Sequence, residues 1–292
     1  MIELNNILNI QNNQSVDLKN INIFHYTKFY QIVIALLRHS ENHCLNYFAY
    51  NTSNCLHFIM AIGDDKNHNI LLLSHILKSD EKPELESLSK EIFALHIYER
   101  EIHENFGINF IGHPWQKPVR FAHNRANQKM QIGDYPFFTI KSEELHEVGV
   151  GPIHAGIIEP GHFRFICNGE NVLHLEIQLG WQHRGIEQLF LDKENNLQRN
   201  LLAENIAGDT VIGHTTAFAQ TFEALTDKQL SEQRHIERAL ALELERIAIH
   251  TGDISALCTD VAYHLGSNIF GILRTAIINF TQFWCGNRFG KV

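Results

Sequence analysis

A glycine-rich segment in the middle of the chain, residues 149–165, concentrates side chains that could carry protons. It contains His154, Glu159, His162 and Arg164. Histidine and glutamate can move protons near neutral pH when their surroundings tune their pKa values. A polar turn whose side chains form only structural hydrogen bonds would have the same composition. The segment by itself therefore leaves both interpretations open.

Other kinds of chemistry have little support in the sequence. It contains no P-loop, no GxGxxG before a helix, no GxSxG and no HExxH pair. The 19 histidines are scattered, so the sequence predicts no zinc site. No cysteines form a CxxC pair and the start lacks a signal peptide, so we expect reduced thiols in a cytoplasmic protein. The five cysteines are Cys44, Cys55, Cys167, Cys258 and Cys285.

Charge and hydropathy limit the partners that the chain could have. The formal net charge is −9 and no run of Lys and Arg occurs, which argues against nucleic acid as a partner and against an electrostatic membrane anchor. The most apolar stretches are too short to span a bilayer, or are interrupted, as residues 268–284 are by Arg274. Any membrane association is therefore expected to come through partner proteins.

The elements before the glycine-rich segment predict a small α+β domain. Apolar residues at helical spacing predict a helix over residues 28–39, and two β-prone runs predict a hairpin over residues 56–77. Residues 84–106 are predicted to be helical, with Gly107 as the natural C-cap. We expect this domain to cover residues 1–123.

The elements after it predict a mainly helical domain. Residues 124–148 show no periodicity and are expected to be a linker, and a second hairpin is predicted around an Asn168-Gly169 turn. The remainder, within a domain of residues 149–292, is predicted to be helical, with two further pieces in residues 255–284. The four helices predicted before that tail are residues 185–191, 195–206, 212–224 and 232–250.

The fourth of these helices, residues 232–250, has three specific features. Ser231 is expected to cap it. A stripe facing the core is predicted from Ile236, Leu240, Leu244 and Ile247. Glu243 and Arg246, three residues apart on one face, are expected to form a buried pair or a docking contact.

A dense motif ends the first domain. Glu99-Arg100-Glu101 precedes Gly107-Ile108, and Phe110 precedes Gly112-His113-Pro114. The alternating charges could simply be a solvated helix face. However, the motif resembles the signature of the C-type small subunit of complex I, which is also found in membrane-bound hydrogenases. His103 departs from it, since the family usually has Asp there. The resemblance implies a docking surface without catalysis.

The glycine-rich segment, together with residues 179–187, resembles the large subunit of energy-converting hydrogenases of the hydrogenase-4 and formate hydrogenlyase type. It is also similar to the related D-type large subunit of complex I. The complex I branch has a quinone-facing histidine here, but this chain has Pro160-Gly161, so that role does not carry over. The resemblance implies that His154, Glu159 and His183 line a buried cavity between subunits.

A third stretch, residues 203–214, is similar to the one that binds nickel and iron in active hydrogenases. There, two cysteine thiolates hold the metals. In this chain Ala207 and Thr210 stand at their positions, Asn205 replaces an arginine, and Gly208 and His214 are retained. Alanine cannot bind a metal and threonine is a poor substitute for a thiolate, so the resemblance predicts no nickel-iron site.

The resemblance implies a function within a larger complex. We expect a fused small-plus-large peripheral-arm subunit of a complex I-like or hydrogenase-4-like oxidoreductase. It would be cytoplasmic and bound to the inner membrane through antiporter-like subunits. The chain itself would bind no cofactor. An iron-sulfur cluster in a partner subunit would deliver electrons to a quinone or to another acceptor nearby. The resemblance to NADH dehydrogenases implies NAD binding and quinone binding in the complex. His154, Glu159, His183 and His214 would line the cavity and couple electron transfer to proton or ion movement.

A second interpretation comes from a different class of protein. The resemblance covers residues 85–292, and the family's large subunit is much longer, so we expect the chain to be truncated relative to it. A truncated helical domain would expose apolar helix faces and associate with a partner or with itself. The alternative function is therefore a catalytically silent structural or interaction protein.

Overall fold

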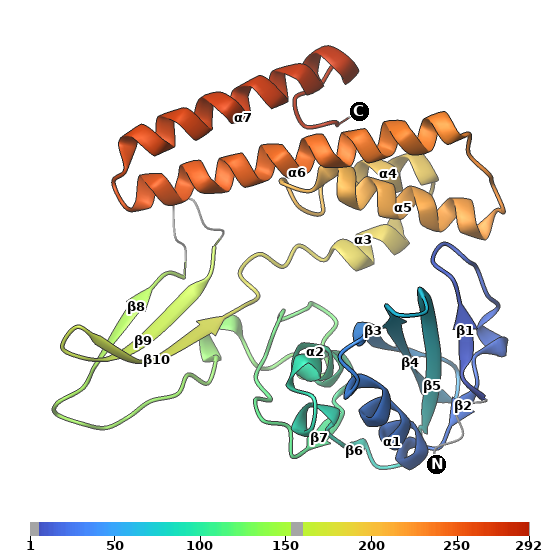
Figure 1. Cartoon of the computed structure of the whole chain (residues 1–292). Helices are drawn as coiled ribbons and strands as arrows, with labels where there is room; N and C mark the ends of the chain where they lie inside the picture. Colours follow the sequence, from blue (N-terminus) through green and yellow to red (C-terminus); the bar gives the residue numbers. More distant parts are fainter. Residues whose placement is uncertain (1–5, 153–159, 292) are drawn as a thin grey trace. The chain divides into compact units, whose positions relative to one another are not determined.

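The computed structural model describes residues 6–152 and 160–291 (Figure 1). The fold is mixed α+β, as predicted: a sheet domain with helices, then a β-hairpin region, then a helical segment. The chain divides into two compact units, Met1–Arg184 and Gly185–Val292, which are described separately. Among the described residues no helix is both long enough and apolar enough to cross a bilayer.

The first unit is built on a five-stranded sheet. The strands lie in the order β1, β5, β4, β3, and β2 pairs with β5 in parallel. They are β1 (Leu8–Ile10), β2 (Ile23–Phe24), β3 (Asn42–Asn51), β4 (Cys55–Asp64) and β5 (Asn69–Lys78). Helix α1 (Tyr26–Leu37) packs on this sheet (Figure 1), and Phe29, Ile32 and Phe58 are fully buried between them. Removing these apolar side chains from water favours folding of the unit.

The predicted helix over residues 28–39 and the predicted hairpin over residues 56–77 are both confirmed, as α1 and as β4 with β5. The helix begins two residues earlier than predicted and ends two earlier. Strand β3 was not predicted. It lies at the end of the sheet order, and it pairs along its length with β4.

The predicted helix over residues 84–106 is wrong in its first half. Residues before His96 form β6 (Glu84–Glu86) and two 3₁₀ turns, η3 (Leu88–Lys90) and η4 (Phe93–Leu95). Only α2 (His96–Phe106) is helical. β6 pairs with β7 (Asn109–Ile111) in parallel, so this stretch folds back beside the end of α2 instead of extending it. Gly107 does end the helix in the left-handed conformation, φ 73°, as predicted.

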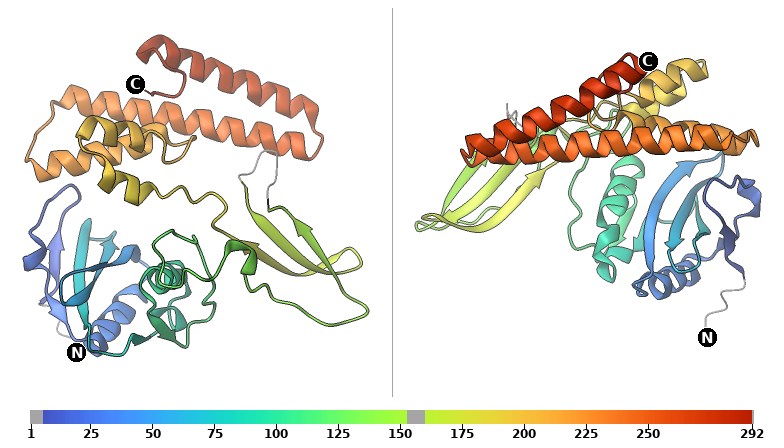
Figure 2. Two further views of the ribbon diagram at one scale, coloured as in Figure 1. Left: turned by 180° about the vertical axis from the view of Figure 1, so that it is seen from behind. Right: turned by 45° about the horizontal axis from the view of Figure 1, so that its top comes forward.

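A three-stranded antiparallel sheet follows in the same unit. Its order is β10, β9, β8, formed by β8 (His146–Val150), β9 (His162–Asn168) and β10 (Asn171–Gln178) (Figures 1 and 2). The second hairpin is confirmed, but its two-residue turn is Gly169–Glu170, because Asn168 pairs with Asn171. Between β7 and β8 the chain is irregular apart from the 3₁₀ turn η5 (Ile132–Asp134).

Helices are the only regular secondary structure among the described residues of the second unit. Its elements are α3 (Ile186–Asp192), α4 (Asn196–Ala203), α5 (Val211–Leu225), α6 (Glu232–Asp260) and α7 (His264–Cys285). Helix α6 is ten residues longer than predicted and includes the first of the two helical pieces predicted in the tail. In Figure 2, α6 and α7 lie side by side along their length.

Three predictions about α6 need correction. Ser231 stands at the N-cap position but makes no side-chain capping hydrogen bond. The stripe predicted to face a core is largely exposed within this chain, since Ile236, Leu240 and Ile247 all present about half of their surface or more to solvent. Glu243 and Arg246 form an ion pair, at 2.9 Å, but both side chains are exposed, so the predicted burial is wrong and the docking contact stays a prediction.

The first unit also buries a histidine, and this sets an expected pH dependence. His75 on β5 is fully buried against Phe29 and Phe58, and its Nε2 lies 3.1 Å from the Tyr47 hydroxyl. Burial lowers the pKa of His75 to about 3. The unfolded chain, with a histidine pKa near 6.5, therefore binds one more proton at intermediate pH, so stability falls as pH falls from about 6.5 towards 3.

We expect the titration of His75 to lower the free energy of unfolding by about 3 kcal/mol between pH 7 and pH 4.5. The value follows from the two pH units between 6.5, the histidine pKa in the unfolded chain, and 4.5. His75→Gln keeps a hydrogen-bond partner for Tyr47 but cannot titrate, so its loss of stability over this range should be smaller by that amount. Urea unfolding at both pH values measures the difference. The exposed His39→Gln variant is the control and should behave like the unchanged protein. An unaltered pH dependence in His75→Gln would disprove the assignment.

Candidate functional site

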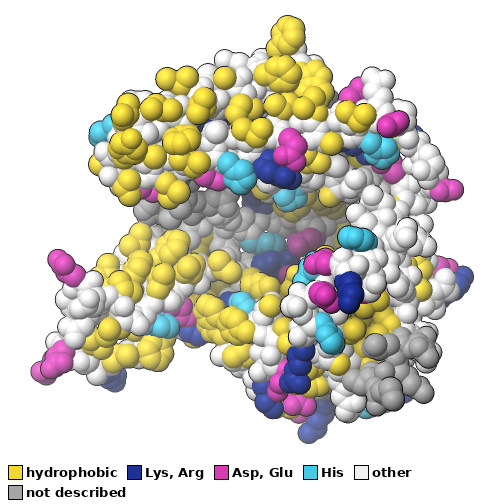
Figure 3. All heavy atoms as spheres, viewed as in Figure 1, with side chains coloured by type: hydrophobic (Ala, Val, Ile, Leu, Met, Phe, Trp, Pro, Cys, Tyr) yellow, Lys and Arg dark blue, Asp and Glu magenta, His cyan; other side chains and the backbone are white. Residues whose placement is uncertain are grey.

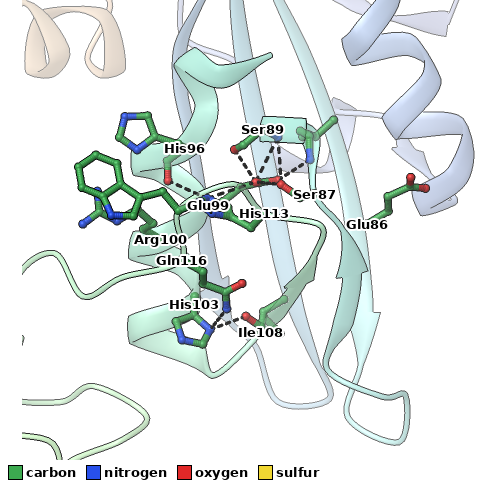
Figure 4. Close-up of polar contacts among 12 residues, drawn as sticks. Glu86, Ser87, Ser89, His96, Glu99, Arg100, His103, Ile108, His113 and Gln116 are labelled. Atoms are coloured by element: carbon green, nitrogen blue, oxygen red, sulfur yellow. Dashed lines mark hydrogen bonds and ion pairs between the residues drawn. The ribbon is translucent and has the colours of Figure 1, made fainter. Parts of the chain in front are cut away.

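The motif at the end of the first domain forms a buried cluster around Glu99. Its carboxylate accepts hydrogen bonds from the hydroxyls of Ser87 (2.6 Å) and Ser89 (2.5 Å) and from the backbone N–H groups of Leu88 (2.7 Å) and Ser89 (3.3 Å) (Figure 4). The side chain has no exposed surface. Burial raises the pKa of Glu99, and these four donors act in the opposite direction. The carboxylate thus fixes the turn that precedes α2.

His113, from the Gly-His-Pro turn, lies against the same carboxylate. Its Nε2 is 3.8 Å from Glu99 Oε2 and 3.3 Å from the His96 carbonyl oxygen, while the N–H of Trp115 donates to Nδ1 (2.9 Å). Because Nδ1 accepts, the proton of the neutral ring is on Nε2. Burial lowers the pKa of His113 to about 4. The ring is therefore neutral at pH 7 and ties the turn to the start of α2 (Figure 4).

Arg100 and Glu104 bind the loop that follows. The guanidinium of Arg100 donates to the carbonyl oxygens of Lys117 (2.7 Å) and Pro118 (2.9 Å) and lies 4.8 Å from the centre of the Trp115 ring. The Glu104 carboxylate accepts from three backbone N–H groups, those of Val119, Arg120 and Ala122, at 2.8 to 3.0 Å. Helix α2 therefore organises residues 113–122 with buried charges.

The interpretation of these charges as a solvated helix face is wrong for the buried ones, and the docking surface implied for the segment stays a prediction. Glu99, Arg100 and Glu104 are buried, so these three side chains do not form a solvated face. Their hydrogen bonds are to the same domain. The departure at His103 has a structural partner too: His103 Nδ1 lies 2.8 Å from the Ile108 carbonyl oxygen and 2.7 Å from Gln116 Nε2.

A second buried charge pair joins this loop to the three-stranded sheet. Lys117 forms an ion pair with Glu176 of β10, whose carboxylate also accepts from the backbone N–H of Phe138 (2.8 Å). Glu176 is 3% exposed. Burial acts to raise the pKa of Glu176, but the hydrogen bonds from Lys117 and Phe138 prevail and lower it. The sequence did not predict this pair, because no pattern in it indicates a contact between residues 59 positions apart.

The described part of the glycine-rich segment forms structural contacts. His162 Nδ1 lies 3.3 Å from the amide oxygen of Gln178, and Arg164 forms an ion pair with Glu147 at 2.7 Å. The Arg164 guanidinium also lies 4.7 Å from the Phe137 ring centre. These two residues thus fit the polar-turn interpretation. His154 and Glu159 lie outside the described residues.

His183 and His214, the other two predicted site residues, belong to different units. His183 is half-buried after β10, and its backbone N–H donates to the Gly180 carbonyl oxygen (3.1 Å). His214 lies in the first turn of α5, with Nδ1 2.8 Å from the Thr210 hydroxyl and 2.9 Å from the Thr210 carbonyl oxygen. The predicted cavity lining that these residues would share remains a prediction.

The stretch that would bind metal in active hydrogenases is a helix start in the second unit. Ala207 and Thr210 lie in the turn before α5, and the Thr210 N–H faces the Ala207 carbonyl oxygen (3.4 Å). The carboxylate of Glu245, from α6, accepts from the backbone N–H groups of Ile212 (2.7 Å) and Gly213 (3.0 Å). Glu245 therefore caps α5, a role that sequence analysis missed. Over the described ranges, 6–152 and 160–291, no group of three or more His, Cys, Asp or Glu side chains is arranged to hold a metal ion.

Comparison with known proteins relates the chain to two kinds of complex. Residues 25–126 match the family model of the respiratory-chain NADH dehydrogenase 30 kDa subunit. The chain is 24% identical to hydrogenase-4 component G of Escherichia coli K12 over 222 residues, 70% of this chain and 40% of that protein. It is 25% identical to formate hydrogenlyase subunit 5 of the same organism, over 71% of this chain and 40% of that one. The C/D subunit of the NADH-quinone oxidoreductase of Phocaeicola vulgatus is also 25% identical, over 70% of this chain and 45% of that protein.

The similarity extends over both units of the chain. A match of 70% of 292 residues is longer than the first unit, Met1–Arg184, so part of it lies in the second. The chain spans less than half the length of these relatives. The comparisons thus relate the chain to the subunit families of complex I and energy-converting hydrogenases.

Proposed function

We propose that this chain, whose residues 25–126 match the complex I 30 kDa subunit family, is a peripheral-arm subunit of a complex I-like or hydrogenase-4-like oxidoreductase. It joins a domain of the small-subunit type to part of a large subunit. The observation that carries the proposal is the similarity, over about 70% of the chain, to proteins named as hydrogenase and NADH-quinone oxidoreductase subunits.

The architecture of the first unit suits a rigid element within such a complex. Buried carboxylates at Glu99 and Glu104 and the buried guanidinium of Arg100 hold the loop after α2 in one conformation. The ion pair between Lys117 and Glu176 then connects that loop to the three-stranded sheet. Polar networks whose members are all hydrogen-bonded favour a single arrangement. The unit could therefore hold a neighbouring subunit at a fixed distance.

The proposed role excludes nickel-iron chemistry by this chain. Alanine at position 207 offers no ligand atom, and the Thr210 hydroxyl is engaged by His214. Electron transfer would depend on an iron-sulfur subunit bound to this chain, and coupling to ion movement on antiporter-like membrane subunits. His154, Glu159, His183 and His214 would line the cavity beside the cluster and carry protons.

Affinity purification of the native gene product from mildly solubilised membranes tests the proposal. Partners are identified by mass spectrometry, and iron and nickel are quantified in the same sample. We expect an iron-sulfur subunit and antiporter-like subunits, with iron and without nickel. Stoichiometric nickel would refute the absence of a nickel-iron site. A chain recovered alone and free of metal would favour the alternative function, a structural or interaction protein without turnover.

Substitution in the purified complex tests the proposed proton carriers. His183→Ala and His214→Ala should each lower electron transfer to an artificial acceptor about a hundredfold or more, in the range usual for losing a general acid or base. The exposed His39→Ala variant is the matched control and should retain full activity. Assembly is checked by the recovery of partners, since a loss of activity with a loss of assembly would indicate a structural role instead.

A further inference from the structure

Histidine side chains are spread over the face of the molecule in Figure 3, so only local geometry can single one of them out. His162, the first residue of β9, is paired directly across the sheet with Gln178 of β10. Its half-buried ring stands edge-on to the ring of Phe137, with 4.9 Å between the ring centres. The hydrogen bond to Gln178 uses Nδ1, which is only one of the two ring nitrogens of His162.

The hydrogen bonds of Gln178 decide which nitrogen of His162 carries the proton. The Gln178 side chain is 1% exposed, and its amide nitrogen donates to the Ile132 carbonyl oxygen at 2.6 Å. Because a carbonyl oxygen can only accept, the amide turns its NH₂ group to Ile132 and its oxygen to His162, 3.3 Å from Nδ1. The amide oxygen is an acceptor too, so Nδ1 is the protonated nitrogen of the neutral ring. The lone pair of the ring is therefore on His162 Nε2.

A cavity next to His162 gives Nε2 room for a proton donor. The cavity has a volume of about 510 Å³, lies within the first unit, and is lined by His162 and by the aromatic rings of Tyr135, Phe137 and Trp181. On the neighbouring strand β8, Gly149 has no side chain, and a Cβ there would lie 3.5 Å from His162 Nε2. The absence of a side chain at position 149 thus leaves the space beside Nε2 open.

The charged groups around the ring are already paired with one another. Arg164, two residues along β9 from His162, binds Glu147 of β8 at 2.7 Å. Glu176 on β10 binds Lys117. Neither carboxylate is therefore free to hold His162 as a permanent cation, so a proton on Nε2 can leave again.

We propose that His162 is a further proton-accepting residue, with Nε2 as the only point at which the proton enters and leaves. Histidine is the side chain whose charge ordinarily changes near neutral pH. A proton from water or from an oxygen acid in the cavity forms an N–H bond at Nε2, and the donor keeps the electron pair of its broken O–H bond. Nδ1 cannot pass a proton on, because the amide of Gln178 that holds it is no proton carrier and is itself bound to a backbone carbonyl oxygen. The purpose of the site, proton uptake coupled to electron transfer, rests on the proposed function.

Nitrogen NMR of the full chain labelled with ¹⁵N-histidine tests the tautomer and the proton uptake. We expect Nδ1 to carry the proton in the neutral ring, and Nε2 to gain a second one as pH is lowered. His162→Gln assigns the signal by removing it. Gln178→Leu removes the acceptor of the Nδ1 proton, so both tautomers should then appear, and circular dichroism checks that each variant remains folded. A neutral ring protonated at Nε2 overturns the proposal, and so does a ring that gains no proton between about pH 8 and pH 5.

Gly149→Val tests the point of entry without changing His162. The valine side chain should cover Nε2 and remove water from it, so the pH at which Nε2 gains its proton should fall by at least about one unit. His146→Gln, an exposed position on the same strand, is the matched control and should leave the titration of His162 unchanged. An unchanged titration in Gly149→Val would show that the proton does not enter from this side of the ring.

Electron transfer by the purified complex tests the role of the stored proton. His162→Gln should lower the rate with an artificial acceptor about a hundredfold or more, as for the loss of a general acid or base, and His146→Gln should retain full activity. Full activity of His162→Gln, with all partners recovered, overturns the role. A failure of the proposed function would appear instead in the unchanged protein, as a chain without partners. It would remove the role in electron transfer, while the NMR result decides by itself whether His162 accepts a proton at Nε2.

Discussion

Replacing Glu99 by alanine is expected to lower the free energy of unfolding by about 4 kcal/mol. The substitution leaves two buried backbone N–H groups and two serine hydroxyls without an acceptor, and an unsatisfied buried donor costs roughly 1–3 kcal/mol, although the hydroxyls can turn elsewhere. A cavity adds to the cost. Glu99→Gln should cost less, because an amide oxygen can still accept from the Leu88 N–H and the charge that burial disfavours is gone. Urea denaturation at pH 7 measures both.

The control for this prediction is Glu91→Ala. Glu91 pairs with Arg38 at 2.8 Å on the surface, and both side chains are more than a third exposed. Exposed pairs contribute little, so this variant should lose less than about 1 kcal/mol. If Glu99→Ala lost no more than Glu91→Ala, the buried cluster would not hold the turn before α2, and the assignment of the motif as an internal clamp would be wrong.

The same cluster shows why the sequence predicted the helix end but not the role of its charges. Gly107 could be identified as a C-cap because the requirement is local: a left-handed residue directly after the last turn. The burial of Glu99 depends on Ser87 and Ser89, which precede the helix and sit in a 3₁₀ turn that helical periodicity could not distinguish from a longer helix. A charged residue at a helical spacing looks the same whether it faces water or a set of buried donors.

Strand β3 and helix α6 show two further limits of pattern analysis. β3 has Asn42, His43 and Asn46 among its apolar residues, so it lacks the clean alternation of a half-buried strand. In α6 the periodicity correctly predicted a helix and an apolar face, but not what covers that face. The prediction that Ile236 and Leu240 face a core is wrong within this chain. Periodicity identifies a face that needs a partner, and the partner can lie in another molecule.

For function, resemblance to known families was more informative than hydrophobic periodicity. It related the chain to complex I and hydrogenase subunits, as the comparisons also do. The residues that it assigned to a shared cavity, among them His183 and His214, are still a prediction. The residues that organise the first unit, Lys117 and Glu176 among them, carry no recognisable motif and became visible only when their contacts were known.

Replacing Lys117 by methionine is the other change expected to have a large effect, about 3–5 kcal/mol at pH 7. It leaves the buried Glu176 carboxylate with the Phe138 N–H and with His174 Nε2 at 3.9 Å, but without the lysine cation, and a poorly compensated buried charge is costly. The matched control is Arg234→Met, which removes an exposed pair with Glu237 and should change stability by less than about 1 kcal/mol. Equal effects of the two variants would contradict the structural role of the Lys117–Glu176 pair.

The pH dependence of Lys117→Met distinguishes a lost charge partner from lost packing. In the unchanged protein the hydrogen bonds from Lys117 and Phe138 lower the pKa of Glu176, so the pair stabilises the fold above the ordinary glutamate pKa and less as pH falls through the lowered value. Without Lys117, burial should raise the pKa of Glu176 instead, so protonation at acid pH removes the cost of burying an unpaired carboxylate. The loss of unfolding free energy caused by Lys117→Met should therefore be smaller at pH 5 than at pH 7.

That loss should also be smaller in the double variant K117M/E176Q, which buries no charge, than in the single variant. A penalty independent of pH, and unchanged in the double variant, would show that Lys117 acts through packing of its aliphatic stem alone.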